Sequence, residues 1–132
     1  GYNLYDRAGY EAELEPLCHA EGVAVIPYYS LAAGFLTGKY RSEADLGKSA
    51  RGVKVKNYLN DRGFKILAAL DGVAARFGTT PGQVAVAWLL AQPTITAPIA
   101  SATSVEQLHD LLAATALTLD ADSVNELTAA SA

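Results

Sequence analysis

The sequence predicts an α/β fold in which short parallel strands are covered by helices. Residues 23–29 (VAVIPYY) and 94–100 (TITAPIA) are short apolar runs, which is typical of strands buried on both faces. Segments with helical spacing flank both runs, and such alternation is typical of a parallel sheet. A third strand is expected only as an end, at Tyr2 and Asn3. So few strands cannot cover the apolar faces of five helices, and the chain is therefore expected to be part of a larger sheet.

Five helices are expected from apolar spacing and from capping residues. They cover residues 10–21, 64–77, 80–91 and 104–114 and the segment after Asp120. The sequences TPGQ (80–83) and SVEQ (104–107) are both typical of helix starts, with a hydroxyl cap and a glutamine three residues later. Residues 30–60 show little periodicity and are expected to form a long loop, which in a compact domain is usually functional or disordered.

Composition excludes several classes of protein. A net charge of −4 argues against binding to nucleic acid. We expect no membrane span and no signal peptide, because no apolar run is long enough and the start GYNLYDR is not basic, so a cytoplasmic location is expected. Cys18 is the single cysteine, so neither an internal disulfide nor a cysteine-based metal site is expected.

Charge is distributed unevenly along the chain. Residues 39–76 carry a net charge of +5, whereas residues 1–38 carry −4 and residues 77–132 carry −5. The basic segment is either an anion-binding loop or a solvated linker with ordinary surface lysines, and the charge pattern alone leaves both interpretations open.

Two segments could bind phosphate. Residues 34–39 (GFLTGK) differ from a phosphate-binding P-loop, because three residues separate the glycines and Tyr40 stands where Ser or Thr would hold magnesium. Residues 99–108 (IASATSVEQL) combine a strand end, small residues and a capped helix start whose free amides can bind an anion. An ordinary loop with a good helix cap fits the latter segment equally well.

Several motifs follow one another in a fixed order. They are IPYYSLAAGFLTGKY (26–40) with the basic loop after it, NYLNDRG (57–63), TPGQVAVAWLLAQP (80–93) and TAPIASATSVEQL (96–108). In this order they resemble the C-terminal part of aldo-keto reductases of the bacterial type related to potassium-channel β subunits. The resemblance implies that residues 1–132 are the C-terminal cofactor-binding portion of a single (β/α)8 TIM barrel domain. YNLYDR (2–7) would end strand 6, and residues 23–29 and 94–100 would be strands 7 and 8. Such a piece is incomplete alone, since a closed barrel takes roughly 250 residues.

The same resemblance implies a cofactor site for NADP, with NAD as a further possibility. Tyr28 would stack on the nicotinamide, and Leu31 and Gly34 would turn along the pyrophosphate. Lys39 and Arg51 would belong to a mobile cationic loop that closes over the phosphates. The eighth-strand loop would hold the adenosine phosphate and adenine through four residues, which are Ser101, Thr103, Gln107 and Asp110.

The sequence departs from the family pattern at three positions. Tyr29 replaces a usual Ser, Leu111 replaces a common Asn, and Ser101 stands where many members have Lys or Gly. The family's catalytic Asp, Tyr, Lys and His lie on early strands and have no counterpart here, so this chain alone is expected to be inactive.

Three functions remain open at this point. The first is the cofactor-binding part of an NADP-dependent carbonyl oxidoreductase, whose partners are a small carbonyl substrate and the missing N-terminal barrel portion. The second is a non-catalytic NADP-binding barrel of the channel β-subunit type. The third is an α/β domain that binds nothing.

Overall fold

The computed structural model describes residues 1–132 and consists of helices joined by extended segments. Six segments are α-helices: α1 (Glu15–Ala20), α2 (Gly52–Val55), α3 (Asp61–Phe77), α4 (Pro81–Leu90), α5 (Val105–Ala116) and α6 (Ala121–Ala130). Four shorter helical segments are η1 (Tyr10–Leu14, a π-helix), η2 (Ala32–Thr37), η3 (Glu43–Lys48) and η4 (Lys56–Tyr58), the last three being 3₁₀ helices. No helix is long and apolar enough to span a membrane.

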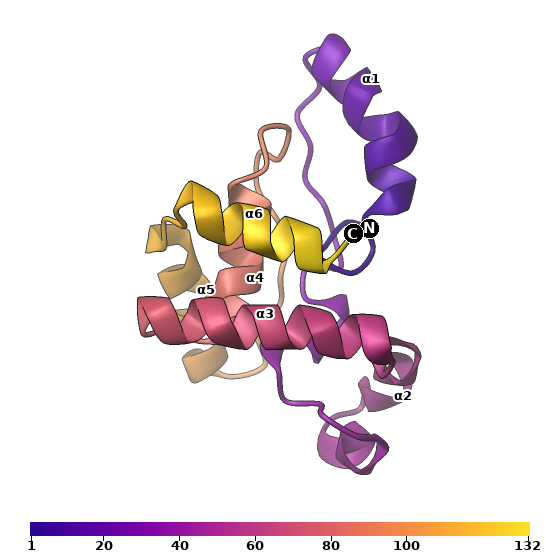
Figure 1. The fold of residues 1–132 in the computed structure, drawn as a ribbon, viewed down its shortest axis with the longest axis vertical. Helices are drawn as coiled ribbons and strands as arrows, with labels where there is room; N and C mark the ends of the chain where they lie inside the picture. The colour runs from indigo at the N-terminus through magenta and orange to yellow at the C-terminus, as the bar shows by residue number, and fades with distance from the viewer.

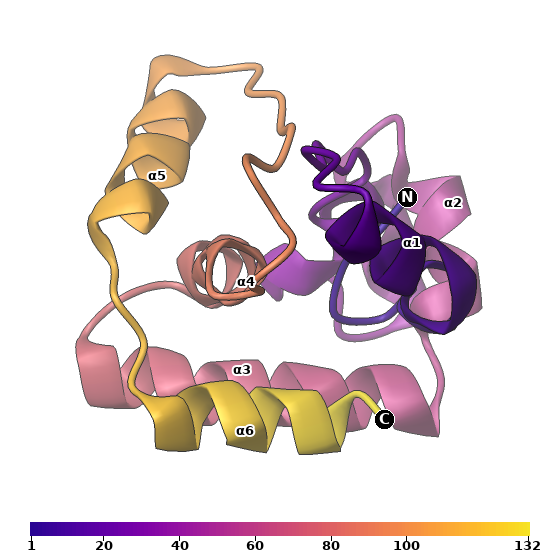
Figure 2. The same ribbon diagram turned by 90° about the horizontal axis from the view of Figure 1, so that it is seen from above.

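Helix α4 lies at the centre of the helical packing and contacts α3, α5 and η2. Helices α3 and α6 lie side by side in one layer, and α4 crosses over them (Figures 1 and 2). Helix α5 packs beside α4, while η1 and α1 stand away from α3–α6 at the top of Figure 1. Residues 84–89 of α4 are all buried, with Trp88 fully enclosed, which confirms the prediction that this uniformly apolar helix lies in the core.

The predicted helix starts are confirmed by their capping hydrogen bonds. The side chains of Thr80, Ser104 and Asp120 accept a hydrogen bond from the backbone N–H three residues later. Helix α3 begins three residues before the first periodic position, because Asn60 caps it in the same way, and it ends at Gly78 in the left-handed conformation as expected.

The two predicted strands are not strands in this structure. Residues 23–29 and 94–100 share one parallel bridge, between Val25 and Ile95. The Thr96 N–H donates to the Val25 carbonyl at 2.8 Å, and the Ile99 N–H donates to the Pro27 carbonyl at 2.9 Å. The predicted third strand is also absent, although the Tyr2 N–H donates to the Tyr28 carbonyl at 3.3 Å. The three extended segments therefore lie side by side without forming a regular ladder.

Prolines and missing neighbours explain the absence of strands. In the register set by the Val25–Ile95 bridge, the next two donors of a parallel ladder would be the nitrogens of Pro27 and Pro98, which carry no hydrogen. The prediction of burial on both faces is also wrong for this chain, because Val23 is 55% exposed and Ile26 is 57% exposed. A strand pair without further strands or covering helices is only marginally stable.

Residues 38–57, here called the basic lobe, are more ordered than the predicted long loop. Tyr40 is buried, and its hydroxyl lies 2.6 Å from the Ser49 hydroxyl. Gly52 approaches the backbone so closely that a Cβ there would lie 1.7 Å from the Leu46 carbonyl oxygen. Short helices η3 and α2 complete the lobe, which lies below α3 in Figure 1.

The Asp45 carboxylate organises the start of the lobe. It forms an ion pair with Lys48 at 2.7 Å and accepts hydrogen bonds from the backbone N–H groups of Arg41 and Ser42 at 2.8 and 3.0 Å. The Lys48 hydrogen bond, helped by the backbone bond from Arg41, lowers the pKa of Asp45 to about 2. The lobe is therefore held by an acid that stays ionised in mild acid.

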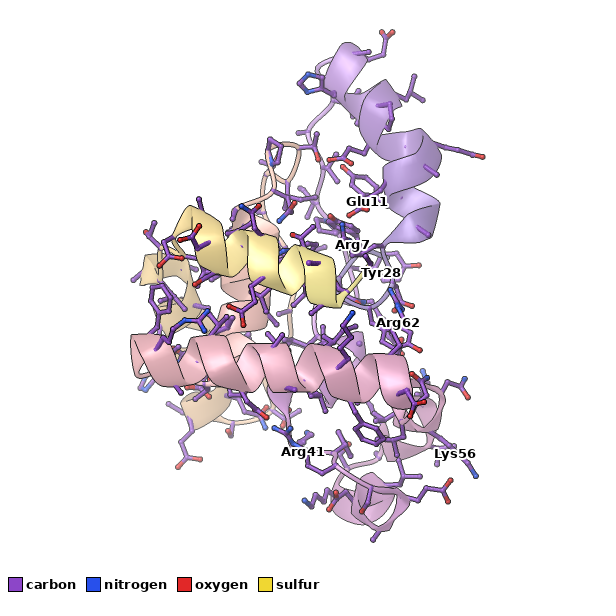
Figure 3. All side chains as sticks on the ribbon, in the orientation of Figure 1. Arg7, Glu11, Tyr28, Arg41, Lys56 and Arg62 are labelled. Carbon is purple, nitrogen blue, oxygen red and sulfur yellow. The ribbon has the colours of Figure 1, made fainter.

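The N-terminal segment and α6 are joined by Arg7. Its guanidinium donates to the Thr128 carbonyl at 2.8 Å and to the Ser131 hydroxyl at 2.7 Å, and it pairs with Glu11 at 2.7 Å (Figure 3). Burial alone would raise the pKa of Glu11, but hydrogen bonds from Arg7 and Tyr2 outweigh it and lower that pKa. The network therefore joins the segment of residues 2–11 to the end of α6.

Two glycines of α3 should respond oppositely to alanine. A Cβ at Gly63 would lie 1.9 Å from the Tyr58 carbonyl oxygen, so Gly63→Ala should lower the free energy of unfolding by about 1–3 kcal/mol or more. A Cβ at Gly72 would meet only side-chain ends at 3.8 Å or beyond. Gly72→Ala should therefore raise the free energy of unfolding by about 0.5–1 kcal/mol. Urea unfolding measures both variants, and equal stabilities would contradict the close approach at Gly63.

Acid should loosen the basic lobe below pH 4. The pKa of Asp45 is lowered from 3.8 to about 2, so its contribution to stability is fully present above pH 3.8, falls between these values and is lost near pH 2. NMR titration of the Asp45 carboxyl and of the Ser42 amide measures this change, and Asp45→Asn should abolish it. A titration midpoint near 4 in the unmodified chain would show that the carboxylate is not held in this way.

Candidate functional site

The candidate site lies where two chain segments run side by side. The Ser30 hydroxyl donates to the Ile99 carbonyl at 2.8 Å, directly after the Ile99–Pro27 backbone bond. Ser30 is 2% exposed, so this bond is protected from water. It places the segment that carries Tyr28 and Leu31 beside the segment that leads to Ser101 and Thr103. A buried serine tie of this kind was not anticipated from the sequence, because burial is not visible there.

Tyr28 presents a free aromatic ring. It is 64% exposed, and its one close aromatic neighbour is Tyr29, whose ring is edge-on at 6.5 Å. The ring lines an open cavity of about 820 Å³, together with Arg7 and Arg62 (Figure 3). A planar ligand could therefore stack on Tyr28 without displacing core side chains.

The chain after Tyr28 makes a tight left-handed turn. Tyr29, Ala32, Ala33 and Gly34 have φ angles of 68°, 49°, 57° and 94°. Such values at residues other than glycine cost about 1–3 kcal/mol each and are concentrated at functional sites. Hydrogen bonds hold the turn: the Leu31 carbonyl accepts from the Gly34 N–H at 2.9 Å, and the Tyr29 carbonyl accepts from the Asn3 side chain at 3.0 Å.

Lys39 folds back over this turn. A Cβ built on Gly34 would lie 3.4 Å from its Cε and 3.5 Å from its Nζ, and the Nζ also lies 5.2 Å from the centre of the Tyr40 ring. The structure therefore places Lys39 against the turn that contains Leu31 and Gly34. A side chain at Gly34 would be strained, because its φ angle is 94°.

Half of the cations in the basic lobe have acidic partners. Arg41 pairs with Asp71 at 2.8 Å, and Lys48 and Lys56 pair with Asp45 and Glu43 at 2.7 and 3.6 Å. The hydrogen bond from Arg41 to Asp71 also raises the pKa of Arg41. Arg41 and Lys56 are labelled in Figure 3 on the part of the chain below α3.

The remaining lobe cations are Lys39, Arg51 and Lys54, whose side chains form no ion pair. Arg51 precedes α2 and is exposed, and no hydrogen bond or ion pair joins its side chain to Lys39 or to the left-handed turn. The structure thus leaves Arg51 apart from the other predicted site residues.

The start of α5 holds a second group of predicted residues. The Thr103 N–H and hydroxyl both donate to the Gln107 side-chain oxygen, at 2.9 and 3.1 Å. The predicted capping box is therefore half correct: Ser104 caps the Gln107 N–H, but Gln107 reaches back to Thr103 rather than to Ser104. The side-chain NH₂ of Gln107 makes no hydrogen bond, and the exposed hydroxyl of Ser101 has no partner either. Free donors therefore gather at this helix start, where negative charge is favoured.

Asp110 is held by a neighbour that was not predicted. Its carboxylate accepts a hydrogen bond from the Gln83 side chain at 2.8 Å, across the contact between α5 and α4. Gln83 would have to release Asp110 before this carboxylate could contact a ligand. Gln83 was recognised from the sequence as part of a helix start, and nothing in the sequence shows that its side chain reaches α5.

Comparison with known proteins shows relatives of one kind. The chain is 40% identical over 121 residues to an uncharacterised oxidoreductase of Mycobacterium bovis, which covers 88% of this chain and 36% of the relative. It is 29% identical over 113 residues to an aldo-keto reductase of Schizosaccharomyces pombe whose name carries NADP(+). This match covers 83% of this chain and 33% of the relative. It is also 30% identical over 116 residues to a probable voltage-gated potassium channel subunit beta of Arabidopsis thaliana. This match covers 83% of this chain and 35% of the relative.

The fold has a counterpart among solved structures. A crystal structure of a thermostable aldo-keto reductase with the inhibitor epalrestat superposes with a TM-score of 0.70 at 26% identity, over 98% of this chain and 37% of that chain. The chain spans about a third of the length of these proteins. The model of the aldo/keto reductase family matches residues 1–132. Since this match extends over the whole chain, the protein belongs to the aldo/keto reductase family.

Proposed function

We propose that this chain is the cofactor-binding C-terminal portion of an NADP-dependent aldo-keto reductase. The parent protein would transfer hydride between NADPH and a small carbonyl compound in the cytoplasm. The observation that carries the proposal is the Ser30–Ile99 bond, because it sets the segment with Tyr28 and Leu31 beside the segment that leads to α5. Membership of the family and the S. pombe relative named with NADP(+) support it.

The residues present fit a dinucleotide with several negative charges. Lys39 and Arg51 are cations without acidic partners, and the start of α5 offers unpaired donors. Gly34 has no side chain and adopts a φ angle of 94° without strain, so it leaves room for phosphate to approach the backbone of the turn. Bound NADPH would supply the hydride, and these residues would hold it in place.

Each predicted residue has one task in this proposal. Tyr28 stacks on the nicotinamide, and Leu31 and Gly34 follow the pyrophosphate. Lys39 and Arg51 close over the phosphates from the basic lobe. The adenosine end is held by the second group, which consists of Ser101, Thr103, Gln107 and Asp110.

Selection of NADP over NAD would depend on the start of α5 and on the basic lobe. No Lys or Arg follows Arg76, so any recognition of the 2′-phosphate must come from Thr103, Gln107 and the lobe. Glu106 in the first turn of α5 opposes added negative charge there. NAD is therefore kept as a second cofactor, and the ratio of NADPH to NADH affinity measures the preference.

We further propose that a preceding portion of the parent completes a (β/α)8 barrel with this chain. Residues 2–7 would then be the end of strand 6, and residues 23–29 and 94–100 would be strands 7 and 8. Large apolar side chains are exposed on the extended segments, on η1, on α1 and on α5, as barrel surfaces lacking their neighbours would be. They are Leu14, Leu17, Val23, Ile26, Ile99, Val105, Leu108 and Leu112. Their burial against the missing barrel would stabilise both parts.

The reduction of a carbonyl also needs a general acid, which this chain does not provide in the family's positions. The catalytic Asp, Tyr, Lys and His would come from the preceding portion. The phenols of Tyr2 and Tyr58 are unsuited to this role, since burial and hydrogen bonds to Glu11 and Asp6 respectively raise their pKa values far above neutrality.

A second candidate is a non-catalytic NADP-binding barrel. The A. thaliana relative, a probable potassium channel subunit, favours it. The two functions differ in the preceding portion: an Asp, Tyr, Lys and His set there supports the reductase, and loss of the Tyr supports the non-catalytic protein. A domain that binds neither cofactor would show no change in tyrosine fluorescence when NADPH is added.

Removal of the Lys39 charge should weaken cofactor binding. In the full-length reductase, Lys39→Gln should raise the Kd for NADPH roughly 3- to 10-fold, because one cationic contact to phosphate is lost. Lys65→Gln, on the exposed face of α3, removes the same charge away from the site and should leave the Kd within about twofold. Fluorescence titration with NADPH measures the Kd of both variants. Equal increases in Kd would show that Lys39 acts only through long-range charge and makes no specific contact with the cofactor.

The 132-residue chain should not reduce carbonyls. Mixed with NADPH and 4-nitrobenzaldehyde, it should show no loss of absorbance at the NADPH band beyond the rate without protein, because the general acid is absent. The full-length protein serves as the positive control. Turnover by the isolated chain would overturn the assignment of catalysis to the preceding portion.

A further inference from the structure

The two ends of the basic lobe meet at a stack of aromatic rings. Phe35, just before the lobe, stacks on Tyr58, just after it, with ring centres 5.3 Å apart and planes at 18°. Tyr5 closes the stack edge-on, 4.7 Å from Tyr58. Tyr58 is 8% exposed, so its ring belongs to the core. The lobe therefore has a fixed base.

The Tyr58 hydroxyl begins a relay of hydrogen bonds. It donates to the Asp6 carboxylate at 2.9 Å, and the same carboxylate oxygen accepts from the Asn3 side chain at 3.1 Å. The Asn3 side chain also donates to the Tyr29 carbonyl at 3.0 Å. Asn3 is fully buried, and its side-chain oxygen accepts hydrogen bonds from the backbone N–H groups of Tyr5 and Asp6 at 2.8 and 2.9 Å. The relay thus joins the end of the lobe to the left-handed turn at residues 29–34.

An open seam surrounds this relay. A cavity of about 370 Å³ separates the lobe from the body of the protein, with walls formed by Tyr5, Asp6, Tyr29, Lys54, Asn57 and Tyr58. The side chains do not pack tightly across it, so the Tyr58–Asp6 bond carries much of the attachment there. Elsewhere the lobe is attached by the buried side chains of Tyr40 and Val55, by the Asn60–Asn57 hydrogen bond at 2.9 Å, and by the Arg41–Asp71 pair. That pair is about half exposed and is therefore weakened by salt.

Resting on the proposed function, we propose that Tyr58 is a positioning residue that acts through Asp6 and Asn3. It couples the basic lobe, with its unpaired Lys39 and Arg51, to the left-handed turn that presents Tyr28 and Leu31. The closure of the lobe over the cofactor phosphates and the shape of the nicotinamide end of the site are then set together. Loss of the relay loosens both ends and speeds cofactor release.

Hydrogen exchange of the full-length reductase without cofactor tests the relay itself. Tyr58→Phe keeps the aromatic stack and removes only the hydroxyl. We expect the amides of Ala32 and Gly34, which donate to Tyr29 and Leu31, to exchange roughly tenfold faster, although they lie more than twenty residues away in the sequence. Tyr40→Phe is the matched control, because its hydroxyl bonds Ser49 within the lobe and should leave these amides unchanged.

Stopped-flow release of NADPH tests the coupling to the cofactor. Tyr58→Phe should raise the dissociation rate roughly 3- to 10-fold and change the association rate less, whereas Tyr40→Phe should leave the dissociation rate within about twofold. Asp6→Asn weakens the same bond from the other side and should mimic Tyr58→Phe, and the double variant should add little to either. Asp6→Asn keeps the test valid if Tyr58→Phe alone disturbs folding.

The outcomes separate the two proposals. Unchanged exchange at Ala32 and Gly34 in both Tyr58→Phe and Asp6→Asn overturns the relay. Faster exchange with an unchanged dissociation rate overturns its role in cofactor release. If the unmodified protein does not bind NADPH, the proposed function fails, and with it the role in release, while the exchange experiment still decides whether the relay exists.

Discussion

The stack of Tyr58 on Phe35 is the contact on which the candidate site depends. It brings the chain back to the left-handed turn after a long excursion, and it does so inside the core. The close approach is possible because Gly63 has no side chain, since a Cβ there would lie 1.9 Å from the Tyr58 carbonyl oxygen and 3.0 Å from the Phe35 ring. Helix α3 can therefore begin directly against the base of the lobe. Lys39 and Arg51 are carried on a lobe whose ends are fixed, which limits the positions that these cations can reach.

Electrostatic pairing changes what the charge pattern implies. The basic segment has an excess of five positive charges in the sequence, but Arg41, Lys48 and Lys56 are engaged by acids in the folded chain. These pairs shape the lobe, as the lowered pKa of Asp45 indicates. Lys39, Arg51 and Lys54 remain for an anionic ligand. The anion-binding loop stays a prediction, and it rests on these three unpaired cations.

The extended segments show that regular geometry in a parallel strand depends on neighbouring strands and covering helices. Residues 23–29 and 94–100 have strand-like composition, yet Pro27 and Pro98 remove the donors that would extend the Val25–Ile95 bridge. Their apolar side chains stay exposed because nothing covers them within this chain. Backbone bonds and the Ser30–Ile99 tie still hold the segments in parallel order. The two segments therefore keep their neighbouring positions and parallel direction without forming regular strands.

Local chemistry in the sequence determined the helices, their caps and the family. Thr80, Ser104 and Asp120 act on amides three residues away, so their role can be read without knowing the rest of the fold. The proximity of Gly34 and Lys39 was also predictable, because only four residues separate them. Tertiary structure alone decided the partners that lie far apart in the sequence: Gln83 with Asp110, Ser30 with Ile99, and Tyr58 with Asp6. Such contacts depend on which segments pack side by side in the folded chain, and the order of residues along the sequence does not show this.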